Sequence, residues 1–194
     1  MLAVANVHPD YLEACLEGCC TGSRYPCRLP EGTVTLIRQT AGGSGKKLYG
    51  VVGIWYYTGE SRQVPSHRLR WSRRFPWQVE FKPLVPRFEK TFCEEFTVPV
   101  TDDESRRGHR SSLHVPGLVY TKLQGIIVRV PPEFAGPYLR ALLKERPEAA
   151  RLKADYRGRQ VAVRSFLSEL AGRLDEEAGK ATPKPPEGPI SAQV

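Results

Sequence analysis

The stretch that decides the fold is GKKLYGVVGIWYYTGESRQVPSHRLRWSRRFPWQVEFKPLV, residues 45–85. Within it, residues 48–57 are rich in β-branched and aromatic side chains and lie between glycines, which predicts a strand buried on both faces. Residues 76–85 alternate apolar with polar side chains, which predicts a half-buried strand. The stretch therefore contains two strands and one long connection between them.

The connection, residues 60–76, is too long and too basic to be a plain link between strands. It interleaves an indole and an imidazole with guanidinium groups, in the order Arg62, His67, Arg68, Arg70, Trp71, Arg73 and Arg74. This pattern predicts a surface that contacts a ligand.

The charge balance of the chain favours a polyanionic partner. The 194 residues include 29 Lys and Arg against 21 Asp and Glu, a net charge of +8 and a pI near 9.4. Solubility alone is the alternative explanation of such a charge. No long apolar run or signal sequence is present, so we expect a cytosolic protein without a membrane partner.

The remaining pattern predicts an α+β domain at residues 1–146. A buried strand at residues 1–7 comes first, and His8-Pro9-Asp10 opens a helix with Tyr11, Leu12, Cys15, Leu16 and Cys19 on its apolar stripe. A loop (21–32) and a strand (33–39) follow. Beyond the central stretch we expect a strand region at 89–100, a polar loop at 101–117, a last strand at 125–130 and a helix to residue 145.

The C-terminal part changes character after Pro147. Residues 147–179 are expected to form a helical extension that packs on the domain or on a partner protein, because apolar residues recur at helical spacing: Val161, Val163, Phe166, Leu167, Leu170 and Leu174. Residues 180–194 are rich in Pro, Lys and Gly and are predicted to be disordered.

The cysteines do not predict a metal site. Cys15, Cys19, Cys20 and Cys27 lack the paired C-x2-C knuckles of zinc sites, and Cys93 lies far downstream. Buried thiols at helical spacing and a local disulfide both remain as interpretations. We therefore expect no metal and no cofactor.

The order of these segments resembles the EVE branch of the PUA-like superfamily, small β-barrels related to YTH and ASCH domains. The resemblance covers residues 1–145 and lies in LYGVVGIWYY, FPWQVEFKPL, Ser112-Leu113-His114 and LQGIIVRVPPEF. It implies a PUA-like mixed β-barrel with flanking helices, to which this chain adds its C-terminal helical extension. It also implies a cleft that accepts a flipped-out base, often methylated, in an aromatic cage beside a basic surface.

The resemblance also implies which residues bind the base. The cage residues would be Tyr56, Tyr57 and Trp71, with Trp55 and Trp77 as alternates, and for each of them a core position is the alternative. The family places a Trp-Gly pair after the first helix, where this chain reads CTGSRY at 20–25. Either the cage is incomplete or Tyr25 substitutes for that Trp.

Phosphates would be bound by two loops, 60–76 and 106–114, which we expect on the same rim of the barrel. The candidate residues are Arg68, Arg70, Arg73, Arg74, Arg106, Arg107 and Arg110. The function expected from these residues is a non-enzymatic module that binds RNA or DNA with a modified or extruded base.

Two other functions compete with nucleic-acid binding. One is an ASCH-like hydrolase or nuclease, but the sequence offers no carboxylate pair or Ser/His/Asp set at useful spacing, so no catalytic residue is assigned. The other is an adaptor that recruits a protein through the amphipathic helix at 161–174.

Overall fold

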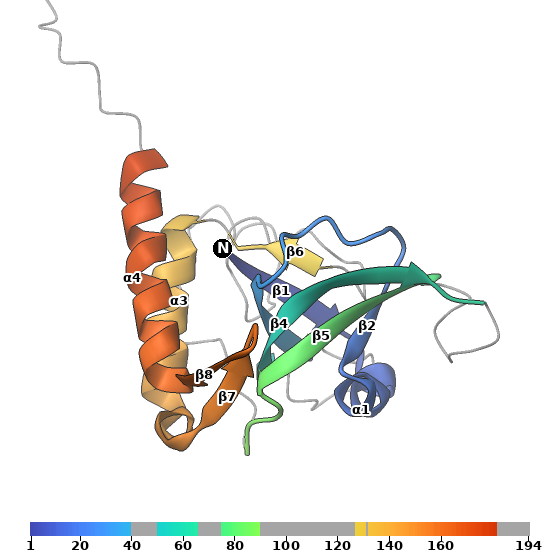
Figure 1. Cartoon of the computed structure of the whole chain (residues 1–194), viewed down its shortest axis with the longest axis horizontal. Coiled ribbons are helices and arrows are strands. Elements are labelled where there is room, and N and C mark those ends of the chain that lie inside the picture. The colour runs from blue at the N-terminus through green and yellow to red at the C-terminus, as the bar shows by residue number, and fades with distance from the viewer. Residues whose placement is uncertain (40–49, 66–74, 90–126, 131, 182–194) are drawn as a thin grey trace, which may run out of the picture.

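The computed structural model describes residues 1–39, 50–65, 75–89, 127–130 and 132–181, and the account below concerns these residues. They form an α+β fold in which a curled sheet is flanked by helices (Figure 1). In chain order the elements are β1 (Leu2–Val7), α1 (Pro9–Gly18), β2 (Cys20–Ser23), β3 (Val34–Gln39), β4 (Gly50–Gln63), β5 (Trp77–Val85), β6 (Ile127–Arg129), α3 (Pro132–Glu145), a 3-10 helix (Pro147–Arg151), β7 (Lys153–Tyr156), β8 (Arg159–Ala162) and α4 (Val163–Ala181).

The main sheet has six strands in the order β2-β5-β4-β3-β1-β6. β1 lies between β3, to which it is parallel, and β6, to which it is antiparallel, and all its residues are buried. The long strands β4 and β5 bend across the molecule and curl the sheet into a half-barrel (Figure 1). The expected α+β architecture with a barrel-like sheet is therefore present.

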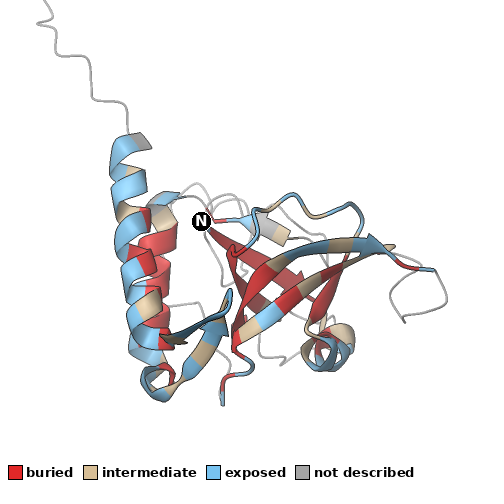
Figure 2. Ribbon diagram, in the orientation of Figure 1, coloured by how far each residue is buried: buried red, intermediate tan, exposed pale blue. Residues whose placement is uncertain are grey.

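Alternation along β4 sends its side chains into two cores on opposite faces of the sheet. Tyr56 belongs to the core beneath α3 and α4, together with residues such as Leu36 and Leu139. Trp55 and Tyr57 belong to the core beneath α1. The buried residues accordingly fill the curl of the sheet and the inner faces of the helices (Figure 2).

The first helix begins where the sequence predicts and ends in an unexpected way. His8 is its N-cap, accepting from the Asp10 amide through Nδ1 at 3.3 Å, and Pro9 occupies the first turn. Cys19 lies beyond the last turn with a φ of 47°, in the left-handed conformation that ends a helix. The prediction that Cys19 belongs to the buried stripe is therefore wrong, whereas Cys15 is buried as expected.

The segment predicted as a loop at 21–32 begins with a strand. β2 pairs antiparallel with β5, from Cys20 opposite Glu80 to Ser23 opposite Trp77. Its residues, CTGS, have no strand-like pattern of their own, so pairing with β5 determines their conformation.

The C-terminal part contains a hairpin that the sequence pattern did not predict, so β6 is not the last strand. β7 and β8 pair antiparallel around Arg157 and Gly158, whose φ values of 54° and 80° fit a two-residue hairpin turn. Val161, predicted to be helical, lies in β8. The α4 helix then packs beside α3 (Figure 1).

The apolar stripe of α4 packs on its own domain, one of the two expected arrangements. Val163, Leu167, Leu170 and Leu174 are buried in the same core as Leu2 and Tyr56 of the sheet. Residues on both sides of position 146 thus share one core. Among the described helices, none is long and apolar enough to cross a membrane.

Several predictions fall outside the described residues. These are the strand region at 90–100, the loop at 101–117, and the tail beyond residue 181. The composition of residues 180–194 predicts a disordered tail, but Lys180 and Ala181 belong to α4.

Candidate functional site

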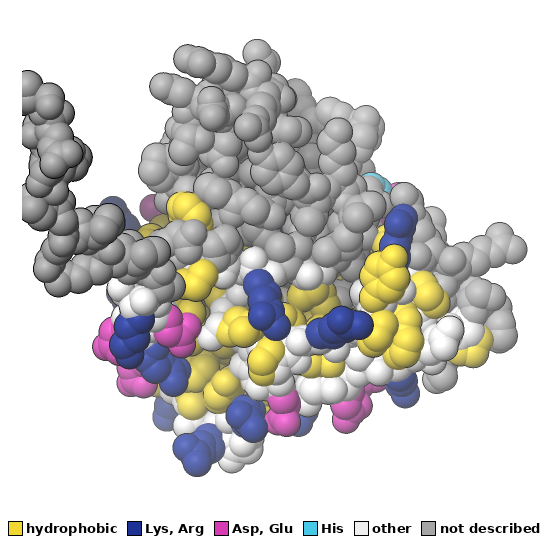
Figure 3. Space-filling model, turned by 90° about the horizontal axis from the view of Figure 1, so that it is seen from above, with side chains coloured by type: hydrophobic (Ala, Val, Ile, Leu, Met, Phe, Trp, Pro, Cys, Tyr) yellow, Lys and Arg dark blue, Asp and Glu magenta, His cyan; other side chains and the backbone are white. Residues whose placement is uncertain are grey.

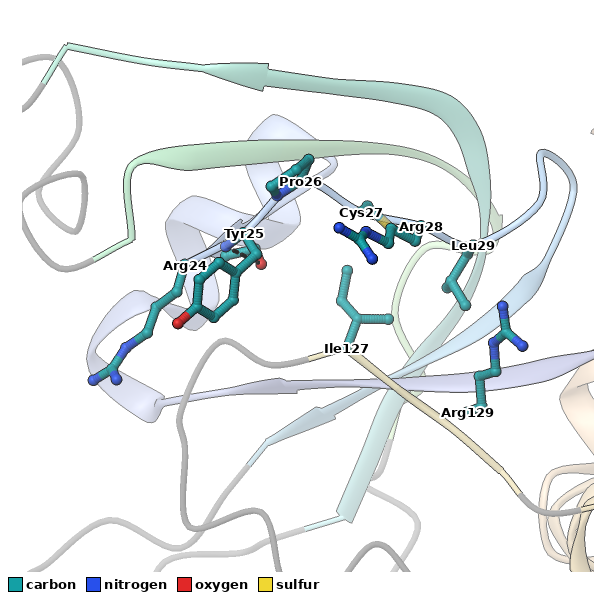
Figure 4. Close-up of a pocket in the computed structure, with 9 residues that line it drawn as sticks. Arg24, Tyr25, Pro26, Cys27, Arg28, Leu29, Ile127 and Arg129 are labelled. Atoms are coloured by element: carbon teal, nitrogen blue, oxygen red, sulfur yellow. Dashed lines mark hydrogen bonds between the residues drawn. The ribbon is translucent and has the colours of Figure 1, made fainter.

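A pocket of about 570 Å³ lies between β6 and the chain that follows β2. Residues 24–31 are called here the 24–31 segment. One wall of the pocket is formed by residues 24–29 of this segment, and the other wall by Ile127 and Arg129. Figure 4 shows Arg24 and Tyr25 at one end of this pocket and Arg129 at the other. The volume is within the range of small-molecule sites.

Local hydrogen bonds fix the 24–31 segment although it contains no regular structure. The Tyr25 amide donates to Ser23 Oγ at 3.3 Å, and the Cys27 amide donates to Ser61 Oγ of β4 at 3.1 Å. At the far end, the Gly32 amide donates to the Tyr57 carbonyl at 2.8 Å. The pocket wall is therefore tied to the sheet at its middle and at its end.

Tyr25 is the most exposed large apolar side chain in the described ranges. Its exposed fraction is 75%, and Met1, at 39%, is the next. An aromatic ring left in water is a ready surface for stacking a flat ligand, and its hydroxyl remains able to bond polar groups.

Three arginines, Arg24, Arg28 and Arg129, give the pocket a positive lining. All three are exposed, and none forms an ion pair with another described residue. Elsewhere arginines are engaged, as in Arg62 to Glu80 at 2.8 Å. The face that carries β6 and the 24–31 segment shows Lys and Arg side chains standing among hydrophobic ones (Figure 3). Free guanidinium groups beside an exposed ring suit an anionic, aromatic ligand.

A smaller cleft lies between the end of β1, α1 and β2. It holds about 10 Å³, room for about one water, and is lined by Asn6, His8, Tyr11, Thr21 and Phe75, among others. Thr21 Oγ1 is buried there without a hydrogen-bond partner in the described structure. A buried hydroxyl costs free energy when unpaired, so a water is the natural occupant.

The structure places the predicted aromatic residues in different environments. Trp55, Tyr56 and Tyr57 have exposed fractions of 1%, 3% and 2%. Trp55 Nε1 donates to the Pro86 carbonyl at 3.2 Å, and the Tyr57 ring lies 6.0 Å from that of Phe81. These rings are packed in the cores and present no open face to a base, so the structure does not support their assignment to a cage.

The other predicted residues are divided between described and undescribed parts of the chain. Tyr25 lines the pocket, and its substitution for the family Trp is still a prediction. Trp77 begins β5, opposite Ser23 and Gln63, is partly buried and is not one of the residues that line the pocket. The residues outside the described ranges are Trp71, Arg68, Arg70, Arg73, Arg74, Arg106, Arg107 and Arg110. Their common rim is therefore still a prediction.

Sequence reasoning missed Arg24, Arg28 and Arg129. The first two flank Tyr25 and Cys27 in RYPCR, a basic and aromatic run between turn residues, which is a usable signal. Arg129 lies in a short strand whose apolar sequence predicts a core element. Its position at the pocket follows only from the pairing of this strand with β1, in which Arg129 lies opposite Ala3.

The thiols near the site are protonated at neutral pH. Burial raises the pKa of Cys27, which lines the pocket, and burial followed by the nearby Cys27 raises the pKa of Tyr57 to about 12. Burial, with a smaller contribution from Cys20, raises the pKa of Cys15 to about 12. Cys15, Cys19, Cys20 and Cys27 are free thiols in the structure, and Cys15 and Cys20 are buried.

No set of three or more His, Cys, Asp or Glu side chains among the described residues is grouped to hold a metal ion. The described pocket lining also contains no carboxylate.

No family model and no curated protein sequence matches the chain. Among solved structures, the chain is similar to a protein from Pseudomonas syringae whose crystal structure was determined by a structural genomics consortium. The TM-score is 0.43 at 13% sequence identity, over 75% of this chain and 99% of that chain.

Proposed function

We propose that this protein binds nucleic acid and that its pocket receives a nucleotide removed from its stack. The observation that carries the proposal is Tyr25, a ring exposed to 75% at the end of a pocket lined by arginines that have no acidic partner within the described part of the chain. A free aromatic face and free guanidinium groups are the two groups that an unstacked nucleotide needs.

Each part of the pocket has a role in this proposal. Tyr25 stacks on the base, and the apolar side chains of Leu29 and Ile127 cover the sugar or the far edge of the ring. Arg24, Arg28 and Arg129 bind the phosphates on either side of the extruded nucleotide. Stacking on one aromatic residue contributes roughly 1–3 kcal/mol per base.

The proposed activity is binding without catalysis. The described pocket lining lacks a carboxylate, and its thiol, Cys27, has a raised pKa. A nucleophile or general base is therefore not among these residues. The free thiols agree with a reducing compartment, and we place the protein in the cytoplasm.

We also propose that the half-barrel is a PUA-like domain of the EVE type. The order of a buried first strand, a short helix and the consecutive β3, β4 and β5 supports this assignment. In this proposal the preference for RNA or DNA, and for a modified base, is determined by which nucleotide fits beside Tyr25.

The test is the affinity of the full chain for short RNA and DNA oligonucleotides, single-stranded or duplex with one unpaired base. Tyr25→Ala should weaken binding by roughly 1–3 kcal/mol, whereas Tyr25→Trp should preserve it. Both variants should melt within a degree or two of the parent, because an exposed side chain contributes little to stability, at most roughly 0.5 kcal/mol.

Arg28→Gln and Arg129→Gln should reduce the salt dependence of binding, each by roughly 0.7–0.9 in the logarithmic slope. The matched control is Arg87→Gln, because Arg87 is paired with Glu13 away from the pocket lining. Equal affinity of Tyr25→Ala and the parent for every probe would refute the proposal.

A further inference from the structure

The chain carries a second cluster of basic residues that the pocket does not use. Between positions 150 and 164 the only acidic residue is Asp155, and the basic residues are Arg151, Lys153, Arg157, Arg159 and Arg164. All five are exposed. Apart from Arg157, none of them forms an ion pair with another described residue. We call Arg151, Lys153, Arg159 and Arg164 the hairpin cluster, because they lie on or directly beside the β7–β8 hairpin.

The hairpin holds this cluster in a fixed arrangement. Its inner side chains Ala154, Tyr156 and Val161 pack against the core beneath α3 and α4. Arg159 lies on the same side as these residues, opposite Tyr156 near the tip, and is exposed. The Val163 amide donates to the Leu152 carbonyl at 3.0 Å, which extends the pairing of the strands to the start of α4. Arg151 and Arg164, each one position further, therefore flank the base of the hairpin from its two sides.

The outer face of the hairpin suits a hydrophilic partner. Lys153 faces outward opposite Ala162, and Asp155 opposite Gln160. The Asp155 carboxylate is engaged, since Oδ1 accepts from Tyr56 OH at 3.3 Å and from the Gly158 amide at 3.1 Å. No large apolar side chain lies on this face, although surfaces that insert into membranes carry such side chains.

The hairpin tip is joined to the wall of the candidate pocket. Arg157 Nε lies 3.3 Å from Glu31 Oε1, and Tyr156 OH donates to the Gly32 carbonyl at 2.8 Å. Glu31 ends the 24–31 segment, whose first part lines the pocket. The end of the pocket wall and the tip of the hairpin are therefore in contact, and the hairpin cluster extends from Arg159 beside this tip to Arg151 and Arg164 at the base.

We infer that the hairpin cluster binds the phosphates of a double-stranded segment adjoining the nucleotide in the pocket. This inference rests on the proposed function and adds its partner: a duplex with an extruded or unpaired nucleotide instead of a free single strand. A two-stranded ribbon with cationic side chains fits against the phosphates that border a groove. The rigid backing of the hairpin keeps these charges in place before binding.

The test compares two charge-matched variants of the full chain. The first replaces the hairpin cluster, Arg151→Gln, Lys153→Gln, Arg159→Gln and Arg164→Gln. The second removes the same charge elsewhere, with Lys82→Gln, Arg87→Gln, Lys144→Gln and Arg173→Gln. The probes are a duplex with one unpaired base, the single strand that carries this base, and phosphatidylserine vesicles.

The hairpin variant should lose at least about tenfold in affinity for the duplex, with a salt slope lower by roughly 0.9 for each phosphate contact removed. The affinity of the hairpin variant for the single strand should change by less than about threefold. The affinity of the control variant for the duplex and for the single strand should also change by less than about threefold, because salt screens long-range charge effects. Circular dichroism and melting curves establish that both variants fold.

Three outcomes would overturn the inference. One is equal loss by the two variants, which would show an effect of net charge alone. Another is an unchanged affinity of the hairpin variant while Tyr25→Ala still weakens binding, which would leave the proposed function standing without this surface. The last is hairpin-dependent binding to phosphatidylserine vesicles without an effect on the duplex. If the parent binds no oligonucleotide, the inference and the proposed function fall together.

Discussion

The aromatic residues of β4 and the aromatic residue of the 24–31 segment have opposite environments. Trp55, Tyr56 and Tyr57 form the densest aromatic run in the sequence, yet their exposed fractions are only 1–3%. Tyr25 stands alone in an irregular segment and is exposed to 75%. The comparison teaches that aromatic density marks the core of this protein, whereas an isolated ring among arginines and prolines marks the surface available to a ligand.

Arginines divide in the same way. Arg62 and Arg87 pair with Glu80 and Glu13 at 2.8 and 2.9 Å. Arg24 and Arg28, in the 24–31 segment, have no acidic partner among the described residues. An exposed ion pair contributes little to stability, about 0–1 kcal/mol, but it does occupy the guanidinium group. The two groups of arginines therefore differ in whether their guanidinium groups are available to a ligand, more than in how many charges they carry.

The largest expected effect is on stability, and it tests the buried aromatic residues of β4. Trp55→Ala should lower the free energy of unfolding by about 3–5 kcal/mol, because it removes a buried indole and leaves a cavity against Phe81. Chemical denaturation monitored by circular dichroism measures this change.

The matched control for Trp55→Ala is Trp77→Ala, since Trp77 is only partly buried. This change should cost less, about 0.5–3 kcal/mol. A loss at Trp55 no larger than that at Trp77 would contradict the assignment of Trp55 to the core.

A smaller effect tests the hydroxyl of Tyr56. Its OH donates to Asp155 Oδ1 and accepts from the Arg157 amide, both at 3.3 Å, and so joins the sheet to the β7–β8 hairpin. Tyr56→Phe should cost roughly 1–3 kcal/mol, because it leaves these partly buried groups without a partner. Tyr25→Phe, at the exposed ring, should change stability by less than about 0.5 kcal/mol. Equal melting temperatures for the two variants would disprove the distinction.

The smallest effect is on the pH dependence of stability. Burial and the neighbouring Cys20 raise the pKa of Cys15 from 9.0 to about 12 in the folded protein. The folded state therefore keeps a proton that the unfolded state loses, so this contribution to stability is complete below pH 9 and is lost as the pH rises toward 12. For one titrating group, the free energy of unfolding can fall by at most about 1.4 kcal/mol per pH unit.

The measurement is the free energy of unfolding between pH 8 and pH 10 for the parent and for Cys15→Ala, a range that begins below the ordinary thiol pKa of 9.0 and ends below the pKa in the folded protein. The parent should lose stability more steeply than the variant. Parallel curves would show that Cys15 does not titrate differently in the two states.

Much of the fold follows from local patterns. The buried strand Leu2–Val7, the helix opened by His8-Pro9-Asp10 and the strands on either side of residues 60–76 were all predictable, because periodicity and capping signals agree there. β2 was not predictable, since CTGS becomes a strand only through its pairing with β5. The β7–β8 hairpin was missed because Val161 and Val163 fit helical spacing with Phe166, although Arg157-Gly158 between alternating residues is a turn signal.

The candidate site was harder to predict than the fold. Tyr25 was predictable only as a substitute for a missing family residue, and Arg24 and Arg28 lay in a segment treated as a connector. Arg129 required knowledge of the sheet order, because β6 reaches the pocket through its pairing with β1. Burial of Trp55, Tyr56 and Tyr57 agrees with the continuous apolar run at residues 48–57, which predicts a strand covered on both faces, whereas their assignment to a cage came from the family resemblance.

The position of β1 also has a consequence for how the protein is made. β1 is an interior strand of the finished sheet, and its β6 edge stays unpaired until residues 127–129, far downstream, have been synthesised. The core around Leu2 and Leu36 is then completed by Leu167 and Leu174 of α4, the last described helix. A nascent chain of this kind exposes an apolar strand edge throughout translation, so its yield in the cell should depend on chaperones that shield such edges.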